Sequence, residues 1–246
     1  MITHRVSRVL EKARLKASLC RQIWSSFDED HRRRGIEVSF SQSGEDILSL
    51  YALRRFGVNV PRYVDIGANH PTRFSNTYLM YLLGGRGINI EPDPEAAEVI
   101  RQARPQDITI NAGVALDEGE KEFFIMSTNV ANTFIRAEAE ELQRRDGNLI
   151  KRVVRVPVCN IRQLLAERGF VPDFLSLDVE GMDLEILESM DWDRCRPKVI
   201  CVETVDYLTQ QKKPEILQFL KEQNYVLYAD TFINSIFKDA KIQPKS

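Results

Sequence analysis

The amino-acid sequence predicts an α/β protein with a doubly wound, mostly parallel sheet and a reversed edge strand. Short apolar runs typical of buried strands alternate with longer helix-like segments. Several of these runs end in an acidic residue, at the position where strands of an open α/β sheet meet their ligands. The chain closes with strand-like runs at 225–228 and 232–237, which predict an antiparallel pair.

The chain is long enough for one good core, and its composition does not divide it into two folded units. It has 246 residues, of which 43% are hydrophobic and 28% charged, and a formal net charge of −2. This charge gives no reason to expect nucleic acid as the main partner. We predict a basic helical extension at residues 1–37, followed by a single folded domain at residues 38–246.

Residues 6–27 predict a basic amphipathic helix. Apolar residues recur from Val6 to Phe27 at alternating spacings of four and three, with Arg and Lys around them. Such a helix needs a surface that covers its apolar stripe. The candidate surfaces are the protein's own core, a second subunit in a homo-oligomer, and an anionic membrane surface.

The cysteines are scattered, and no segment predicts a membrane span or a secretion signal. Cys20, Cys159, Cys195 and Cys201 form no C-x-x-C pair, which argues against a zinc site and a disulfide framework. Nowhere do about 18 apolar residues run together, and the amino terminus lacks the apolar core of a signal peptide. We expect a soluble, cytoplasmic protein with reduced thiols.

The first predicted element of the domain is a helix at 47–53, which follows Ser-Gln-Ser-Gly-Glu-Asp at 41–46. In one interpretation Ser43 caps this helix and Asp46 is its third residue, which completes a capping box. In the other, the free N–H groups of the helix terminus and the side chain of Gln42 bind a cofactor carboxylate or close the pocket.

A short buried strand at 63–66 comes next and ends in a sharp turn. Asp65, Gly67 and Asn69 supply the polar and small residues of this turn, and a helix is predicted at 75–83. A strand that ends in this way places polar groups at the carboxyl edge of a parallel sheet. The turn is therefore a candidate cofactor site.

The second strand, at 87–91, ends in Glu91, where an acid commonly accepts hydrogen bonds from ribose hydroxyls. A dinucleotide would require G-x-G-x-x-G to bring backbone N–H groups onto its pyrophosphate, and this chain lacks that pattern. The predicted ligand is a nucleoside without phosphates, of which S-adenosylmethionine is the common one. Its ribose would pair with Glu91, and its methionine part would lie against the turn at 65–69.

The remaining elements continue the alternation up to the closing pair. Helices are predicted at 94–103, 161–168, 184–190 and 214–223, and strands at 108–116, 121–126, 153–158, 174–181 and 198–202. The polar segment 127–151 interrupts this order and contains a charged, helix-like run. It is either a lid or acceptor-binding insertion, or a surface helix.

Acidic side chains at the last two parallel strand ends form the predicted catalytic group. Asp178 and Glu180, two residues apart on an extended strand, point to the same side and would serve as base and orienter. Alternatively, these two acids and Glu203 hold Mg²⁺, which prefers oxygen ligands. We favour base chemistry without a metal.

Several blocks of the chain together resemble the FkbM-type S-adenosylmethionine-dependent methyltransferases. They are SQSGED at 41–46, YVDIGANHP at 63–71, SNTY at 75–78, GINIEPDP at 87–94, NAGVAL at 111–116 and FLSLDVEGMDLEIL at 174–187. The resemblance covers about residues 38–238. It implies a class I, Rossmann-like methyltransferase fold and methyl transfer to oxygen, often a sugar hydroxyl in glycan or natural-product biosynthesis. Within the matched blocks we also expect Pro92, Asn111 and Asp178 to contact the cofactor.

One pair of residues departs from this resemblance. Many members have Asp-Gly or a similar pair where this chain has His70 and Pro71. Pro71 stiffens the loop and removes a backbone donor. His70, next to the expected pocket, is either a general base with a pKa near neutrality or a loop residue that only packs or hydrogen-bonds.

The leading functional hypothesis is an O-methyltransferase that acts on a saccharide or a glycosylated metabolite. Two alternatives remain. The first is N-methylation of an amine-bearing small molecule, which needs less help from a base. The second is a cofactor-binding or interaction protein that has lost catalysis, with the helix at 6–27 as its docking element. The acids at 91, 178 and 180 argue against such a loss.

Overall fold

The computed structural model describes residues 37–128, 131–179, 181–206 and 209–243, and six single residues between 11 and 25. The predicted helix at 6–27, with its proposed docking role, therefore lies almost entirely outside the described residues. Within them, no helix has the length and apolar character needed to cross a lipid bilayer.

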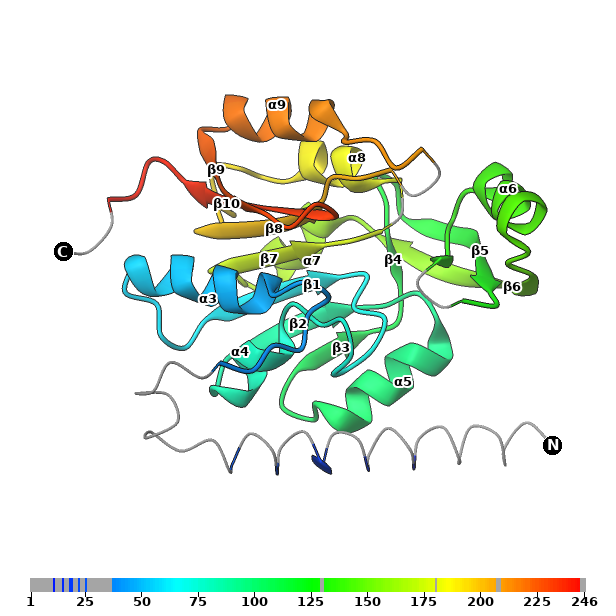
Figure 1. The fold of residues 1–246 in the computed structure, drawn as a ribbon, viewed down its shortest axis with the longest axis horizontal. Coiled ribbons are helices and arrows are strands. Elements are labelled where there is room, and N and C mark those ends of the chain that lie inside the picture. Colours follow the sequence, from blue (N-terminus) through cyan, green and yellow to red (C-terminus); the bar gives the residue numbers. More distant parts are fainter. Residues whose placement is uncertain are drawn as a thin grey trace.

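A seven-stranded, mostly parallel sheet forms the centre of the molecule (Figure 1). β10 runs antiparallel to its two neighbours, so the reversed strand lies between β8 and the edge strand β9. The predicted doubly wound sheet and its closing antiparallel pair are both present. In spatial order the strands are β3 (Ile108–Ile110), β2 (Arg86–Ile90), β1 (Arg62–Ile66), β7 (Phe174–Leu177), β8 (Val199–Glu203), β10 (Asn234–Asp239) and β9 (Tyr225–Asp230).

Helices cover both faces of this sheet (Figure 1). On one side lie α3 (Glu45–Arg55), α4 (Tyr78–Leu82) and α5 (Pro94–Ala103); on the other lie α7 (Ile161–Glu167), α8 (Asp183–Ser189) and α9 (Pro214–Glu222). Strand residues alternate between the two cores. Val64 and Ile66 of β1 pack with residues of α7, α8 and α9, whereas Tyr63 packs with residues of α3 and α4.

A second, three-stranded sheet stands beside the first, in the order β4-β6-β5. It consists of β4 (Gly113–Val114), β5 (Gly119–Met126) and β6 (Ile150–Cys159), and α6 (Arg136–Asp146) lies in the connection between β5 and β6. The single strand predicted at 108–116 is therefore wrong. The chain leaves the main sheet after β3 and joins the second sheet at β4. Alternation identifies strands, but it does not tell which sheet each strand joins.

The start of α3 also differs from the predicted capping box of Ser43 and Asp46. Gly44 is the N-cap, with φ +92°, and no side chain caps the helix there. Instead, Ser41 Oγ accepts hydrogen bonds from the N–H groups of Gly44 (3.1 Å) and Asp46 (3.3 Å). The Asp46 carboxylate accepts from the N–H of Phe40 (2.7 Å) and from Ser41 Oγ (2.8 Å). This local network fixes the segment before α3 to the first turn of the helix.

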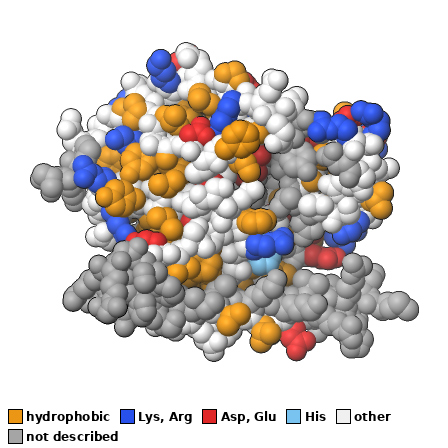
Figure 2. All heavy atoms as spheres, viewed as in Figure 1, with side chains coloured by type: hydrophobic (Ala, Val, Ile, Leu, Met, Phe, Trp, Pro, Cys, Tyr) orange, Lys and Arg blue, Asp and Glu red, His pale blue; other side chains and the backbone are white. Residues whose placement is uncertain are grey.

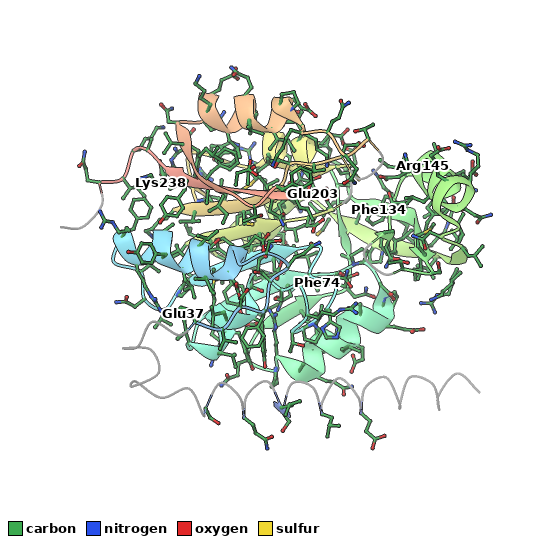
Figure 3. All side chains as sticks on the ribbon, in the orientation of Figure 1. Glu37, Phe74, Phe134, Arg145, Glu203 and Lys238 are labelled. Atoms are coloured by element: carbon green, nitrogen blue, oxygen red, sulfur yellow. The ribbon has the colours of Figure 1, made fainter. Side chains whose placement is uncertain are left out.

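Charged side chains are interspersed on the face of the molecule that Figure 2 shows. Lys and Arg alternate there with Asp, Glu and small apolar groups over the coloured part of the surface (Figure 2). The two sheets meet within the same view. Figure 3 places Phe74, Phe134 and Glu203 around that junction, whereas Glu37, Arg145 and Lys238 lie at the periphery.

Candidate functional site

A cavity of about 310 Å³ opens at the carboxyl ends of the parallel strands, where the main sheet meets the second sheet. Its lining includes the residues that follow β1, β2 and β7, the last residue of β8, and side chains from β4, β5 and the β5–β6 connection. This position at the strand ends is the ligand-binding edge of open α/β sheets. Its volume lies within the range of small-molecule sites.

The turn after β1 brings the backbone itself to the cavity wall. Gly67 has φ +81°, and a β-carbon there would lie 1.8 Å from the carbonyl oxygen of Asp178. The N–H groups of Gly67 and Ala68 donate to the carbonyl of Ile90 at 3.0 and 3.3 Å. Only glycine fits at position 67, because the turn lies directly between the ends of β2 and β7.

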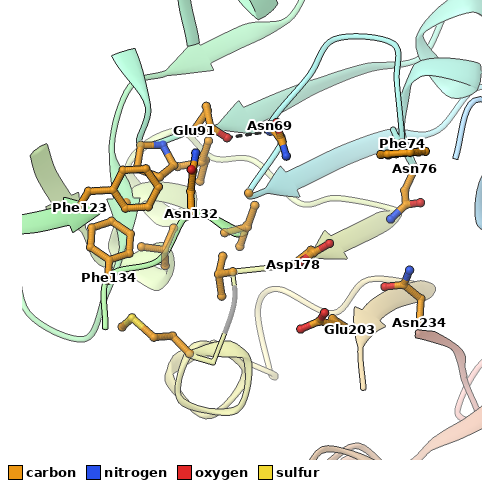
Figure 4. Close-up of a pocket in the computed structure, with 18 of the residues that line it drawn as sticks. Asn69, Phe74, Asn76, Glu91, Phe123, Asn132, Phe134, Asp178, Glu203 and Asn234 are labelled. Atoms are coloured by element: carbon orange, nitrogen blue, oxygen red, sulfur yellow. Dashed lines mark hydrogen bonds between the residues drawn. The ribbon is translucent and has the colours of Figure 1, made fainter. Parts of the chain in front are cut away.

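Glu91 fixes this turn to the end of β2. Its carboxylate accepts one hydrogen bond from the N–H of Asn69 at 2.7 Å (Figure 4) and another from the N–H of Asp93 at 2.8 Å. The residue is only 4% exposed, and it lines the cavity. Burial raises the pKa of Glu91 to about 7, against the two backbone donors, which lower it.

The cavity has two chemically different ends (Figure 4). Phe123, Phe134 and Asn132 lie at the Glu91 end, where the two aromatic rings are 4.7 Å apart between centroids. Val114 and Met182 also line the cavity. The opposite end carries Phe74, Asn76, Glu203 and Asn234, and Asp178 lies between the two ends. One end therefore suits a flat apolar ring, and the other suits a ligand rich in hydrogen-bonding groups.

Two carboxyl groups face this polar end. Burial raises the pKa of Asp178, and the nearby Asp183 carboxylate raises it further. Burial and the Asp178 charge likewise raise the pKa of Glu203. Lys213 opposes both shifts. Its ammonium group donates to Glu203 Oε2 at 3.0 Å and to Asp183 Oδ2 at 3.3 Å. Because Glu203 contacts the ammonium directly, we assign the lasting negative charge to Glu203 and the exchangeable proton to Asp178.

The predicted Mg²⁺ site gains no support from the described residues. In residues 37–128, 131–179, 181–206 and 209–243 no three His, Cys, Asp or Glu side chains are arranged to hold a metal ion. Glu180, the third predicted ligand and the predicted orienter, lies outside the described residues. Glu203 already has a cation as its partner, the ammonium of Lys213.

Most of the predicted cofactor residues line the cavity: Gln42, Gly67, Asn69, Glu91, Pro92 and Asp178. Asp65 does not. It alternates along β1 with Val64 and Ile66, so its side chain faces the α4 side, where its carboxylate accepts from Thr77 Oγ1 at 2.5 Å. The direct cofactor contact predicted for Asp65 is therefore replaced by a structural role beneath the turn.

Asn111 and His70 also lie outside the cavity lining. Asn111 Nδ2 donates to the carbonyls of Glu91 and Pro92, both at 2.9 Å, and so holds the loop that carries these two lining residues. His70 Nδ1 accepts from the N–H groups of Thr72 (3.1 Å) and Arg73 (3.0 Å). Because this ring nitrogen serves its own loop, the geometry favours the loop role of His70 over the general base.

Several lining residues could not be identified from the sequence. Phe74, Phe123 and Asn234 come from loops and strands that carry no motif. Asn76 belongs to the SNTY block at 75–78, but that block gave no site role to it. Asn132 and Phe134 belong to the segment 127–151, which was predicted as either a lid or acceptor-binding insertion, or a surface helix. These two residues line the cavity at its Glu91 end (Figure 4), and α6 lies at the surface (Figure 1).

Comparisons with known proteins place the chain in a family. A family model described as the methyltransferase FkbM domain matches residues 65–227. No curated protein sequence matches the chain. Its fold is similar to that of a methyltransferase from Geobacter sulfurreducens, with 12% identity, coverage of 89% of this chain and 90% of the other, and a TM-score of 0.41.

Two further solved structures are similar in the same way. One is an O-methyltransferase from Bacillus cereus in complex with S-adenosylhomocysteine (12% identity, coverage of 93% and 87%, TM-score 0.38). The other is a TehB-like S-adenosylmethionine-dependent methyltransferase from Corynebacterium glutamicum (10% identity, coverage of 92% and 98%, TM-score 0.42).

Proposed function

The chain belongs to the FkbM family of methyltransferases, and we propose that it transfers a methyl group from S-adenosylmethionine to a hydroxyl of a sugar, in a glycan or a glycosylated metabolite. The observation that supports this proposal is the division of one cavity into two ends. A buried carboxylate with aromatic rings lies at one end, amides and carboxyl groups lie at the other, and Asp178 lies between them.

The residues at the Glu91 end fit the nucleoside part of the cofactor. A carboxylate offers about four lone-pair sites, and backbone N–H groups use two of those of Glu91. The remaining sites suit the two hydroxyls of a ribose. Phe123 and Phe134 supply apolar surface for an adenine ring. The tight turn at Gly67 lets the backbone approach the rest of the ligand closely.

When bound, S-adenosylmethionine supplies an electrophilic methyl group on a sulfonium. The protein's own part is to orient the acceptor hydroxyl and to take its proton. We assign that proton to a carboxylate oxygen of Asp178, whose raised pKa brings it closer to the range in which a general base works best near neutral pH. Glu203, held by Lys213, keeps a second carboxylate at the acceptor end.

An amine acceptor is the second candidate, and one observation favours it. The described lining residues include the carboxyl groups of Glu91, Asp178 and Glu203, and none of them is Lys, Arg or His. Such a cavity attracts a cation such as a protonated amine. Product analysis separates the two reactions, because methyl ethers and methylamines differ in acid–base behaviour and in fragmentation.

The test begins with the cofactor. Calorimetric titration of the full chain should show binding of S-adenosylmethionine and no binding of NAD⁺. A panel of sugar acceptors is then incubated with a donor that carries a deuterated methyl group, with and without Mg²⁺, and products are identified by mass spectrometry. Asp178→Asn should keep cofactor affinity and lose turnover. Full activity in this variant would contradict the assignment of the base.

Cytoplasmic location, homo-oligomer formation and contact with a membrane surface stay predictions that follow from the composition and from residues 6–27. Removal of residues 1–30 tests the last two. A change in size in solution indicates a subunit contact, and a change in vesicle partition indicates a membrane contact.

A further inference from the structure

A buried amide oxygen without a hydrogen-bond donor lies at the acceptor end of the cavity. Asn234 lines the cavity and is only 4% exposed. Its Nδ2 group donates to Glu45 Oε1 at 3.3 Å, whereas its Oδ1 atom has no hydrogen-bond partner among the described residues. A buried carbonyl oxygen left in this way costs about 1–3 kcal/mol. A hydroxyl group from a ligand would supply the missing donor.

Glu45 fixes which way the amide of Asn234 points. Its Oε1 atom also accepts from Thr231 Oγ1 at 2.6 Å, and its Oε2 atom accepts from the N–H of Ser43 at 2.7 Å. Because the carboxylate is an acceptor, the NH₂ group of Asn234 must face it. The amide oxygen is therefore turned the other way, toward the side where Asp178 and Glu203 lie (Figure 4).

Phe74 adds an exposed aromatic surface at the same end. It lines the cavity, is 52% exposed and has φ +54°, an unusual backbone conformation for a bulky residue. The loop is pinned on both sides of it. The N–H groups of Thr72 and Arg73 donate to His70 Nδ1, and the N–H of Ser75 donates to the carbonyl of Phe40 at 3.0 Å. Backbone strain that persists in this way is typical of functional sites.

The charge of the cavity restricts the acceptor further. Among the described lining residues, the carboxyl groups of Asp178 and Glu203 face this end and none of the residues is basic, so a phosphate or a uronate here would meet repulsion. The side-chain amide of Asn76 lies at the same end as Asn234 (Figure 4), and Gln42 also belongs to the lining. Amides, carboxylates and an aromatic face are the groups that recognise a ring with many hydroxyls and an apolar C–H face.

We propose that this end of the cavity is the acceptor subsite and that it takes a neutral, polyhydroxylated ring such as a pyranose. Asn234 Oδ1 accepts a hydrogen bond from one ring hydroxyl, and Phe74 covers the C–H face of the ring. This inference rests on the proposed function, because the methyl donor must occupy the other end.

The experiment uses the full chain saturated with S-adenosylhomocysteine and three probes of defined charge. They are methyl α-D-mannopyranoside, its uronate, and methyl 2-amino-2-deoxy-α-D-glucopyranoside, each followed by saturation-transfer NMR and titration. We expect the neutral glycoside to bind and the uronate to bind at least tenfold more weakly. Equal binding of neutral glycoside and uronate would overturn the inference, and so would preferential binding of the amino sugar.

Two variants and a matched control identify the residues. Asn234→Ala and Phe74→Ala should each weaken glycoside binding about tenfold and leave S-adenosylhomocysteine affinity unchanged. Phe232→Ala is the control, because Phe232 is also an exposed Phe with positive φ (60% exposed, φ +75°) but does not line the cavity. Phe74→Ala removes an exposed side chain, so its fold should survive, and thermal melting verifies this for all three variants.

These measurements test the proposed function and the acceptor subsite separately. Failure of the wild-type chain to bind S-adenosylhomocysteine contradicts the proposed function and the subsite together. Two results overturn the subsite alone when cofactor binding is normal. One is that the wild-type chain does not bind the glycoside, and the other is that glycoside affinity is unchanged in both Asn234→Ala and Phe74→Ala.

Discussion

Gly67 and Asp178 touch backbone to backbone: a β-carbon on Gly67 would stand 1.8 Å from the carbonyl oxygen of Asp178. The strands that precede them are also joined there, since the N–H of Asp178 donates to the carbonyl of Ile66 at 3.1 Å. The turn on the cofactor side and the strand end that carries the proposed base therefore form one rigid wall. A change at either residue should move both.

Substitution of Gly67 by Ala should damage the fold by two separate effects. The left-handed backbone costs an L-residue about 1–2 kcal/mol, and the clash with Asp178 adds to it because neither backbone can move freely. Urea denaturation measures the total. Gly44→Ala is the matched control, since Gly44 has φ +92° and nothing lies within 4 Å of an added β-carbon. Equal losses of stability in the two variants would show that the close approach is unimportant.

Affinity for S-adenosylmethionine should rise between pH 6 and pH 8. The pKa of Glu91 is about 7 because of its burial, and ribose hydroxyls donate to its ionised form. Protonation below this pKa removes the acceptor, so affinity should fall by up to about tenfold per pH unit. Calorimetry at three pH values measures the slope, and Glu91→Gln should flatten it. If the affinity of Glu91→Gln still rises with pH, a group other than Glu91 causes the pH dependence.

The same raised pKa should affect the stability of the unliganded protein in the opposite sense. A glutamate in the unfolded chain has a pKa of about 4.3, below the folded value of about 7 for Glu91. Its contribution to the free energy of unfolding is therefore fully present below pH 4.3 and is lost as the pH rises through 7. In Glu91→Gln, the free energy of unfolding should therefore fall less between pH 5 and pH 8 than in the wild-type protein.

Lys213 should be far more important for stability than its neighbour Lys212. Its side chain is 12% exposed and pairs with Asp183 and Glu203, which are 1% and 7% exposed. Removal of one partner from a buried pair costs about 3–5 kcal/mol. Lys213→Met should show a loss of this order at pH 8 and a smaller one at pH 5, where protonated carboxyl groups need no cation.

Lys212→Met provides the control, because Lys212 pairs with Asp230 at an exposed site, where such pairs contribute about 0–1 kcal/mol. Urea denaturation at pH 5 and pH 8 gives the loss of stability of each of the two variants at each pH. A loss in Lys213→Met that does not depend on pH would mean that packing, and not charge, explains the role of this residue.

Arg104 should be necessary for the loop that carries Phe74 and Asn76. Its guanidinium is 1% exposed and donates to the carbonyl of Pro71 (2.8 Å), to Ser75 Oγ (2.6 Å) and to Thr77 Oγ1 (2.8 Å). A lysine ammonium is compact and cannot span these partners. Arg104→Lys should therefore lower stability by about 2–4 kcal/mol and speed amide exchange at residues 70–77.

Arg101 provides the control: it lies in the last turn of α5, just before Arg104, and pairs with Glu98 at an exposed site. Arg101→Lys should change stability by less than about 0.5 kcal/mol. Amide exchange that stays slow at residues 70–77 in Arg104→Lys would show that other contacts hold the loop.

The strand-end residues illustrate what a pattern can and cannot predict. Gly67, Glu91 and Asp178 follow apolar runs, and the rule that parallel strands share a carboxyl edge was enough to bring them together. The same rule misplaced Asp65, because a strand alternates its two faces and Asp65 points to the helix side. A shift of one residue along the strand therefore changes the face of the sheet on which a side chain lies.

The amino-acid sequence by itself determined the alternation of strands and helices in the main sheet, the family, and the acids Glu91, Asp178 and Glu203 at the cavity, because periodicity and motifs are properties of neighbouring residues. The tertiary structure decided what neighbours in sequence cannot encode. Glu45 orients Asn234 across 189 positions of the chain. The strands β4, β5 and β6 form their own sheet, and Phe123 of β5 and Phe134 of the β5–β6 connection meet at the Glu91 end of the cavity. These features depend on long-range contacts, which form only when the whole core packs.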